Sequence, residues 1–478
     1  MIAALVLLPI LAGFALYLLP RDAAAPAKWF GVAVAFATFA LAILGANAPD
    51  ESWRWLQRPF TANFHVGLGG LGFWIVLLLT LSTACALATV RIARQRDFVA
   101  QMLFLLGAMA GVFIARDLLL FALFWDLMLV PVFLMLIVWS PDGCTGSAWR
   151  YLVYNLSGGL ALLLATAGYG VVEGSTDVIG LSTGHGASAI GAAWGIWIFA
   201  GYALGFLVKT PVWPLHTWMP DTYADLPPAA VAVVSGVQSK AGLYGFLVVT
   251  IPLLPEQMRL AATALFVLGL VGLVYGALVA LVQDDAKRVV AYSSLSHLGL
   301  IVLALFSGNA LAIGGAAVYI IAHGLFSAGL FLVLGAVEAR EETRLISRLG
   351  GLGDRNPQLA GALHIVALAA LGLPGLCGFA GEILILTGLY QAGAFWPTAI
   401  ALVPIVLAAA YMLRLFQGMM HGPERADLPA RGDLRPSELL ALAPLVAAIV
   451  ALGLYPGPVA SSAAAANANA SVATAEHR

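Results

Sequence analysis

Six ionisable side chains stand inside long apolar stretches of this sequence, which otherwise keep charge out. They are two carboxylates, two amines and two imidazoles: Asp126, Lys209, Lys240, His297, His323 and Glu382. A charged side chain at the centre of a bilayer costs roughly 2.5–3.5 kcal/mol on insertion scales, so such groups are rare and usually functional. Because burial disfavours charged forms, amines, imidazoles and carboxylates in such places can exchange protons near neutral pH. The six residues therefore predict a proton relay, and they suit neither a hydrolase nor a metal enzyme.

The positions of the two lysines decide between a buried and an interfacial interpretation. Lys240 is far from both ends of its apolar stretch, so its side chain is too deep to reach the membrane surface. Lys209 is nearer an end and could extend to the interface, as lysines often do. A carboxylate at Asp126 would hold Lys209 in its charged form, and moving that carboxylate away would favour proton loss. Ser293, Ser296 and trapped water could carry a proton onward.

Three further polar residues have simpler explanations. A single histidine in a membrane span is more often a packing residue than a proton carrier, and we expect this of His364. His216 and Asp221 lie near the end of an interrupted apolar stretch, where they either cap a helix, contact a loop or join the relay.

The composition requires that these residues be held by membrane helices. The 478 residues are 62% hydrophobic and 10% charged, with a mean hydropathy of +0.96, whereas a soluble domain carries about 25% charged residues. The net charge of −1 and the absence of a basic, aromatic-rich cluster argue against nucleic-acid binding. Three widely separated cysteines indicate neither disulfides nor a metal site.

Apolar runs of about 20 residues can cross a bilayer as helices. We therefore predict an all-α polytopic membrane protein with about 14 transmembrane helices. The predicted spans begin near Ile2, Trp29, Gly67, Val99, Leu118, Tyr151, Gly191, Pro227, Leu260, Val289, Leu311, Leu359, Trp396 and Leu439. We expect short connections, with the longest polar ones at 338–358 and 420–438.

Two of the predicted spans are interrupted. The seventh breaks at Lys209-Thr210-Pro211-Val212-Trp213-Pro214 and the twelfth at Leu373-Pro374-Gly375. Proline removes a backbone donor and glycine loosens a helix, and interruptions at matching places in two halves are typical of inverted-repeat transporters. We predict two inverted five-helix repeats, spans 4–8 and 9–13. The predicted parts of the chain are N-terminal helices at 1–98, repeats at 99–251 and 258–419, and a C-terminal helix with tail at 437–478.

Most of the 23 lysines and arginines lie in one set of alternate connections, including Arg91, Arg150, Arg288, Arg340 and Arg435. The positive-inside rule places these connections in the cytoplasm, so both termini are predicted on the periplasmic side of a bacterial inner membrane. Lys209 and Lys240 are the two basic residues that no connection explains.

Five segments carry a resemblance to a known family. PLHTWMPDTYADLPP, SGVQSKAGLYGF, AYSSLSHLGLIVLALFSG, IIAHGLFSAGLFLVLGAVEAR and LPGLCGFAGEILIL resemble the antiporter-like subunits of respiratory complex I. The same family includes subunits of Mrp-type antiporters and of membrane-bound hydrogenases. The resemblance is dense from Arg116 to about Gln417. Glu382 matches the subunit type with a glutamate, where its relatives carry lysine, in the broken span twelve.

The resemblance implies a proton-translocating membrane-arm subunit of NADH-quinone oxidoreductase, driven by quinone reduction elsewhere in the complex and without a redox site of its own. The family's relay consists of an acidic residue and its partner lysine, a central lysine, two connecting histidines and a terminal carboxylate, which match Asp126, Lys209, Lys240, His297, His323 and Glu382. Two departures stand out, because the family's glutamate is aspartate at Asp126 and its Glu-Ala-Pro-Thr reads Asp225-Leu226-Pro227-Pro228. They leave open a divergent paralogue in a variant complex.

The resemblance also implies cofactors and partners. We expect no cofactor or metal on this chain, with FMN, iron–sulfur clusters and quinone on partner subunits. The expected partners are L-like and N-like antiporter subunits and the lipid bilayer, not nucleic acid. The alternatives are a subunit of an Mrp-type cation/proton antiporter or of a membrane-bound hydrogenase, and a structural scaffold. The intact set of six buried groups argues against the scaffold, since unneeded charges in a membrane would be costly.

Overall fold

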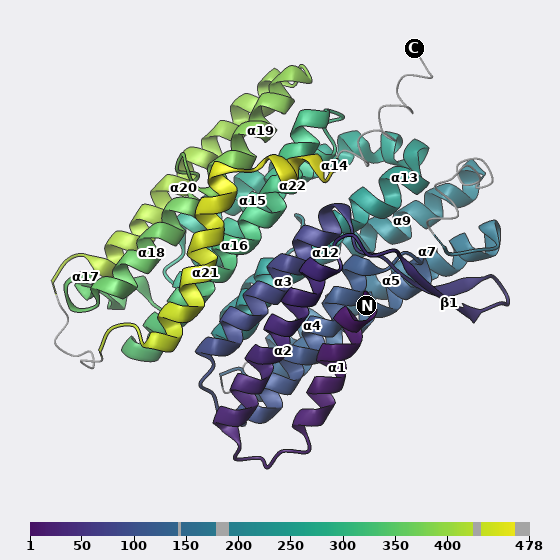
Figure 1. The fold of residues 1–478 in the computed structure, drawn as a ribbon. Coiled ribbons are helices and arrows are strands. Elements are labelled where there is room, and N and C mark those ends of the chain that lie inside the picture. The colour runs from purple at the N-terminus through teal and green to yellow at the C-terminus, as the bar shows by residue number, and fades with distance from the viewer. Residues whose placement is uncertain (142–144, 178–190, 424–431, 464–478) are drawn as a thin grey trace.

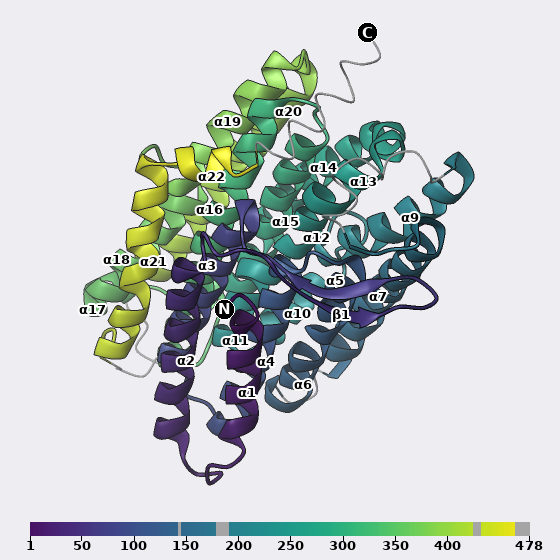
Figure 2. The ribbon, with the colours of Figure 1, turned by 45° about the vertical axis from the view of Figure 1, so that its right-hand side comes forward.

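The computed structural model describes residues 1–141, 145–177, 191–423 and 432–463, which form a bundle of long helices with one small β-hairpin (Figures 1 and 2). Among these residues, 11 helices are long and apolar enough to cross a membrane, and three shorter apolar helices accompany them. The prediction of an all-α polytopic membrane protein is confirmed. The number of 14 spans, the two repeats and the division of the chain into parts stay predictions.

The N-terminal part comprises three helices and the hairpin: α1 (Ala4–Leu16), α2 (Ala24–Leu44), β1 (Glu51–Leu56), β2 (Ala62–Val66) and α3 (Gly70–Thr89). The hairpin was not predicted, because residues 45–69 look like a polar connection. Its strands pair antiparallel, with Trp53 opposite Phe64 and their rings 5.7 Å apart. Such aromatic cross-strand pairs stabilise a sheet. The hairpin lies beside the end of α7 and the start of α5, where Thr61 N donates to Gly174 O.

The next part of the chain contains the first interrupted helix. Its elements are α4 (Gln95–Ile114), α5 (Leu118–Leu127), α6 (Leu129–Trp139), α7 (Thr145–Glu173), α9 (Ala192–Lys209), α10 (Met219–Asp225), α11 (Pro228–Val233), η1 (Val234–Gln238), α12 (Lys240–Gly245), η2 (Phe246–Thr250) and α13 (Ile251–Leu253). Of these, η1 and η2 are π-helical turns within one continuous helix. The division between α5 and α6 was not predicted. It falls at Met128, where Pro131 cannot donate to the preceding turn.

The remaining chain contains the second interrupted helix. Its elements are α14 (Pro255–Val282), α15 (Ala286–Leu305), α16 (Ala310–Glu341), η3 (Ile346–Arg348), α17 (Leu352–Arg355), α18 (Pro357–Ala370), α19 (Cys377–Gln391), α20 (Phe395–Met420), α21 (Pro436–Leu454) and α22 (Gly457–Ser461). Helix α16 is central, and its most apolar 18-residue window is entirely buried. Residues 464–478 of the predicted tail and 424–431 of the predicted connection 420–438 lie outside the described residues.

Both predicted interruptions are confirmed. Helix α9 ends at Lys209 and α10 begins at Met219, and the carbonyl of Val208 at the break accepts a hydrogen bond of 3.0 Å from Trp218 Nε1. Helix α18 ends at Ala370 and α19 begins at Cys377. Gly372 adopts φ +80° within this second break, a conformation that side chains rarely allow. The first break begins among buried residues, Thr210 to Val212, whereas residues 373–375 of the second break are exposed.

The described chain ends lie together at one end of the bundle. The N-terminal amine pairs with Glu51 beside the hairpin, and the carbonyl of Ser462 lies close to Gly70 at the start of α3. Ion pairs join the arginine-rich connections at the other end, which we call the arginine-rich end. They are Arg150 and Arg288 with Asp221, Arg340 with Glu438, Arg344 with Asp285, and Lys287 with Glu338.

Glycines allow the helices that carry the relay residues to approach closely. A carbon placed at Cβ of Gly276 in α14 would lie 2.6 Å from Ser296 N in α15. The same carbon at Gly299 would lie 2.5 Å from Leu273 N. Membrane helices associate through such small-residue contacts because lipid supplies no hydrophobic drive between them. The position of His297, one residue after Ser296, depends on this contact.

We predict that Gly276→Leu separates α14 from α15, whereas Gly361→Leu in α18 does not disturb the bundle. The Gly361 position has nothing within 4 Å of an added Cβ, so it serves as the matched control. Overpacking a close helix contact costs about 1–3 kcal/mol. Thermal unfolding of the detergent-purified protein should show a lower Tm for the Gly276 variant only. Equal Tm values for both variants would contradict the close packing of α14 on α15.

Candidate functional site

Lys240 is completely buried, yet its ammonium has three hydrogen-bond partners. Nζ lies 2.6 Å from Ser235 O, 3.1 Å from Ser239 Oγ and 2.6 Å from His323 Nδ1. An ammonium carries three donors, and a buried charge without partners would cost several kcal/mol. The site therefore accommodates the charged lysine, while the histidine offers a nitrogen to which its proton can pass.

The backbone of the Lys240 helix is adapted to this role. The π-turns η1 and η2 lie directly before and after the segment of α12 that begins at Lys240. Ser239 N bonds to Val234 O, five residues back, at 3.3 Å. In this widened turn, Ser235 O accepts both the ammonium of Lys240 and the hydroxyl of Ser239. Such turns are rare and are frequent at functional sites.

The two predicted histidines lie next to each other in the structure. The ring centroids of His297 in α15 and His323 in α16 are 5.7 Å apart. Each ring uses Nδ1 for a hydrogen bond, His323 to Lys240 and His297 to Tyr319. Both Nε2 atoms are buried without a protein partner. Buried polar atoms of this kind are usually satisfied by water, which could connect the two rings.

Tyr319 joins His297 to Glu382. Its hydroxyl lies 2.6 Å from His297 Nδ1 and donates to Glu382 Oε1, also at 2.6 Å. A phenol has one proton to donate, so the direction of the two bonds depends on the carboxyl group. When Glu382 is ionised, Tyr319 donates to it and accepts from His297. When Glu382 is protonated, the bonds can reverse and Tyr319 donates to His297.

Sequence reasoning missed Tyr319, although a signal for it exists. Tyr319 precedes His323 by four residues in α16, and residues four apart share one face of a helix. An aromatic residue in an apolar helix is nevertheless most often part of the core. Gly372 leaves space for the other oxygen of Glu382, since a Cβ there would collide with Oε2. The break in the second interrupted helix thus accommodates the carboxylate.

The predicted contact between Asp126 and Lys209 is absent. The two side chains interact electrostatically, but the described structure shows no hydrogen bond or direct ion pair between them. Lys209 Nζ lies 5.3 Å above the ring of Trp125, a cation–π geometry, and the Asp126 carboxylate packs against Gly159 of α7. Asp126 is half-buried, whereas Lys209 is fully buried.

The other polar residues have structural roles. Asp221 pairs with Arg150 and Arg288, so it links α10 to α7 and α15 at the arginine-rich end. His364 packs on the ring of Phe416 with centroids 4.8 Å apart, and His216 packs on Tyr275 at 5.2 Å. His216 also hydrogen-bonds to the backbone of Pro214, which agrees with a contact inside the interrupted segment.

The serines near His297 bond elsewhere. Ser293 Oγ lies 3.1 Å from the hydroxyl of Tyr411. Ser296 Oγ donates to Leu273 O at 2.7 Å. These two hydroxyls hold helices together and do not contact the imidazole.

Comparisons with known proteins show which family this chain resembles in sequence and structure. The family model described as NADH:quinone oxidoreductase/Mrp antiporter, TM matches residues 115–408. NADH-quinone oxidoreductase subunit M of Rhodobacter capsulatus is 32% identical over 455 residues, covering 91% of this chain and 88% of that protein. A chain of respiratory complex I from Thermus thermophilus is 31% identical with a TM-score of 0.89, covering 98% of this chain and 100% of that one. A chain of the Mrp complex from Dietzia sp. shares the fold, with 19% identity, a TM-score of 0.87, and coverage of 98% and 96%. The sequence-based resemblance to subunit M, the type with glutamate in span twelve, is confirmed.

We predict that Asp126→Asn destabilises the protein because it removes the charge that balances buried Lys209. The double variant Asp126→Asn/Lys209→Gln should recover part of the loss, since it leaves no uncompensated charge. Asp126→Glu keeps the charge and should be tolerated. Thermal unfolding in detergent should show a Tm decrease of roughly 2–4 °C for the single Asn variant. Additive losses in the double variant would show that the two groups do not interact.

Proposed function

Because this chain belongs to the NADH:quinone oxidoreductase/Mrp antiporter transmembrane family, we propose that it is the proton-translocating M-type membrane subunit of an NADH-quinone oxidoreductase. The observation that carries the proposal is the row of buried groups from Lys240 through the histidines and Tyr319 to Glu382. Its relatives are subunits of an enzyme complex, and this chain serves such a complex by moving protons rather than electrons.

Proton transfer within this row follows from its hydrogen bonds. The proton shared by Lys240 Nζ and His323 Nδ1 can move from one nitrogen to the other across 2.6 Å. The proton then moves from Nε2 of His323 to Nε2 of His297 through a bridging water. From His297 the proton reaches Glu382 by a double transfer at Tyr319, which gives its own proton to the carboxylate as it receives another. Tyr319 returns to neutral after each passage.

Asp126 and Lys209 form the other part of the proposed relay. Their charges attract each other without contact, and Coulomb attraction changes steeply at short range in a poorly screened interior. A movement of α5, whose continuity is interrupted at Met128, would therefore change how strongly Lys209 holds its proton. The exposed side chains of Leu123 and Leu127 place this end of the relay near the lateral surface of the subunit.

The proposal includes the surroundings of the subunit. We propose that the chain lies in a bacterial inner membrane with both ends on the periplasmic side and the arginine-rich end in the cytoplasm. Other membrane-arm subunits, L-like and N-like, would flank it, and FMN, iron–sulfur clusters and quinone would lie on partner subunits. The identity with subunit M over most of the chain favours this function over an Mrp-type antiporter or a membrane-bound hydrogenase.

Lys240→Ala and Lys240→Arg should both abolish most proton pumping while the complex still assembles. Alanine removes the proton carrier, and the guanidinium of arginine is too basic to release a proton. Lys287→Arg is the matched control, because Lys287 is also buried but pairs with Glu338 at 2.7 Å. A pH-sensitive dye in proteoliposomes measures pumping. Full pumping by both Lys240 variants would exclude the residue as a carrier.

Tyr319→Phe should lower pumping by at least about tenfold, because general acid–base groups contribute factors of this size or larger. The substitution keeps the ring that packs on His297 and removes the hydroxyl. Tyr202→Phe is the control, since its buried hydroxyl bonds only to Thr166. Tm values of both variants separate folding from transport. Wild-type pumping with Phe at 319 would mean that water alone connects His297 to Glu382.

A further inference from the structure

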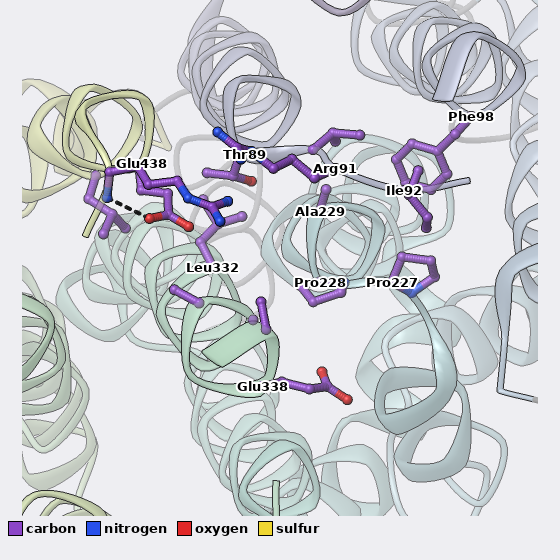
Figure 3. A pocket seen from close by; sticks show the side chains of 16 residues that line it. Thr89, Arg91, Ile92, Phe98, Pro227, Pro228, Ala229, Leu332, Glu338 and Glu438 are labelled. Carbon is purple, nitrogen blue, oxygen red and sulfur yellow. Dashed lines mark hydrogen bonds between the residues drawn. The ribbon is translucent and has the colours of Figure 1, made fainter. Parts of the chain in front are cut away.

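A pocket opens at the arginine-rich end of the bundle, away from the relay. Its volume is about 260 Å³, and the ends of four helical segments meet around it (Figure 3). Thr89 closes α3, Pro228 begins α11, Glu338 lies near the end of α16 and Glu438 near the start of α21. The pocket thus lies where the N-terminal helices face the second part of the chain.

The charges around this pocket are not balanced. Glu438 accepts from Arg340 at 2.6 Å, and Glu338 pairs with Lys287 at 2.7 Å, so both acidic groups have cations outside the pocket. Arg91 and Arg435 line the pocket, and neither side chain has a hydrogen bond or ion pair within the described structure. The two guanidinium groups are therefore available to a ligand.

Lys28 strengthens the positive field at the same place. Lys28 as a whole is 7% exposed, and its ammonium interacts electrostatically with Arg91 and Arg435 from two other segments. The three like charges repel one another, and Glu438, which attracts Lys28, is already paired with Arg340. An anion that contacts the two arginines would offset this repulsion. Guanidinium groups bind phosphate oxygens with two parallel hydrogen bonds.

The remaining walls are apolar. Ile92, Phe98, Leu332 and Leu442 line the pocket beside the arginines. On α21, Leu439 follows the lining residue Glu438 and is 38% exposed, and Leu440 further round the helix is 63% exposed, so the side of α21 beside the pocket presents an apolar surface. A ligand with an anionic headgroup and apolar chains fits this combination. A free anion would make no apolar contacts with these walls. Basic pockets between helices on the cytoplasmic side bind anionic lipid headgroups.

We propose that this pocket binds the phosphodiester headgroup of an anionic phospholipid, with Arg91 and Arg435 as its ligands and Lys28 behind them. The bound lipid joins α2 and the α3–α4 connection to α21. Its acyl chains lie along the exposed face of α21. The site is independent of the proton relay.

Lipid binding to the intact purified complex tests this site. The complex carrying Arg91→Gln/Arg435→Gln is compared with the wild type and with Arg54→Gln/Arg58→Gln, which removes two exposed arginines from the hairpin at the other end. Native mass spectrometry measures retention of added dioleoyl phosphatidylglycerol. We expect at least about tenfold weaker retention in the pocket variant, since each basic residue near a membrane surface contributes about 1 kcal/mol, and no change in the control.

Two further measurements separate lipid from other ligands and guard against misfolding. Thr89→Trp narrows the pocket without changing charge and should also displace phosphatidylglycerol, even where the double Gln variant fails to assemble. Dioleoyl phosphatidylcholine and inorganic phosphate serve as competing probes and should not displace the bound lipid. Unchanged phosphatidylglycerol retention in either pocket variant overturns the proposal. Equal retention of phosphatidylcholine, or displacement by inorganic phosphate, overturns it as well.

Discussion

The ammonium of Lys240 in the centre of an apolar bundle is the constraint on which the surrounding structure depends. A buried charge persists only where every donor finds an acceptor, and here backbone, serine and histidine supply all three. The widened turn before Lys240 presents the carbonyl of Ser235, and α16 presents His323. The most apolar window of α16 is entirely buried, and both His323 and Tyr319 are buried on this helix.

The two ends of the proposed relay differ in structure. From Lys240 to Glu382 the groups are linked by short hydrogen bonds and one pair of neighbouring rings. At Asp126 and Lys209 the groups interact only through space, and the helix bearing Asp126 is interrupted two residues later. Fixed hydrogen bonds favour rapid proton transfer along a set path. A separated pair is better suited to respond to movement, because its interaction energy depends on distance.

Helix ends serve two purposes in this fold. Inside the bundle, the interrupted ends at Lys209 and Gly372 make room for buried ionisable groups. At the arginine-rich end, ion pairs such as Arg340 with Glu438 lock the connections together while Arg91 and Arg435 stay available. The two sets of helix ends lie apart, because the pocket is lined by none of the buried ionisable groups of the proposed relay.

The sequence by itself determined the class of fold and both helix interruptions, and it singled out the six ionisable residues of the proposed relay. It could do so because a charged residue or a proline within an apolar run is a strong local signal. Local signals also identified Lys240 as too deep to reach the surface. Tertiary structure decided which groups touch. In the folded chain, Tyr319 lies between His297 and Glu382, and Asp126 makes no direct contact with Lys209. Ser293 hydrogen-bonds to Tyr411 and not to a residue of the proposed relay. Pairing across helices depends on their relative rotation and spacing to within an ångström, which glycine contacts between distant segments set and no single segment encodes.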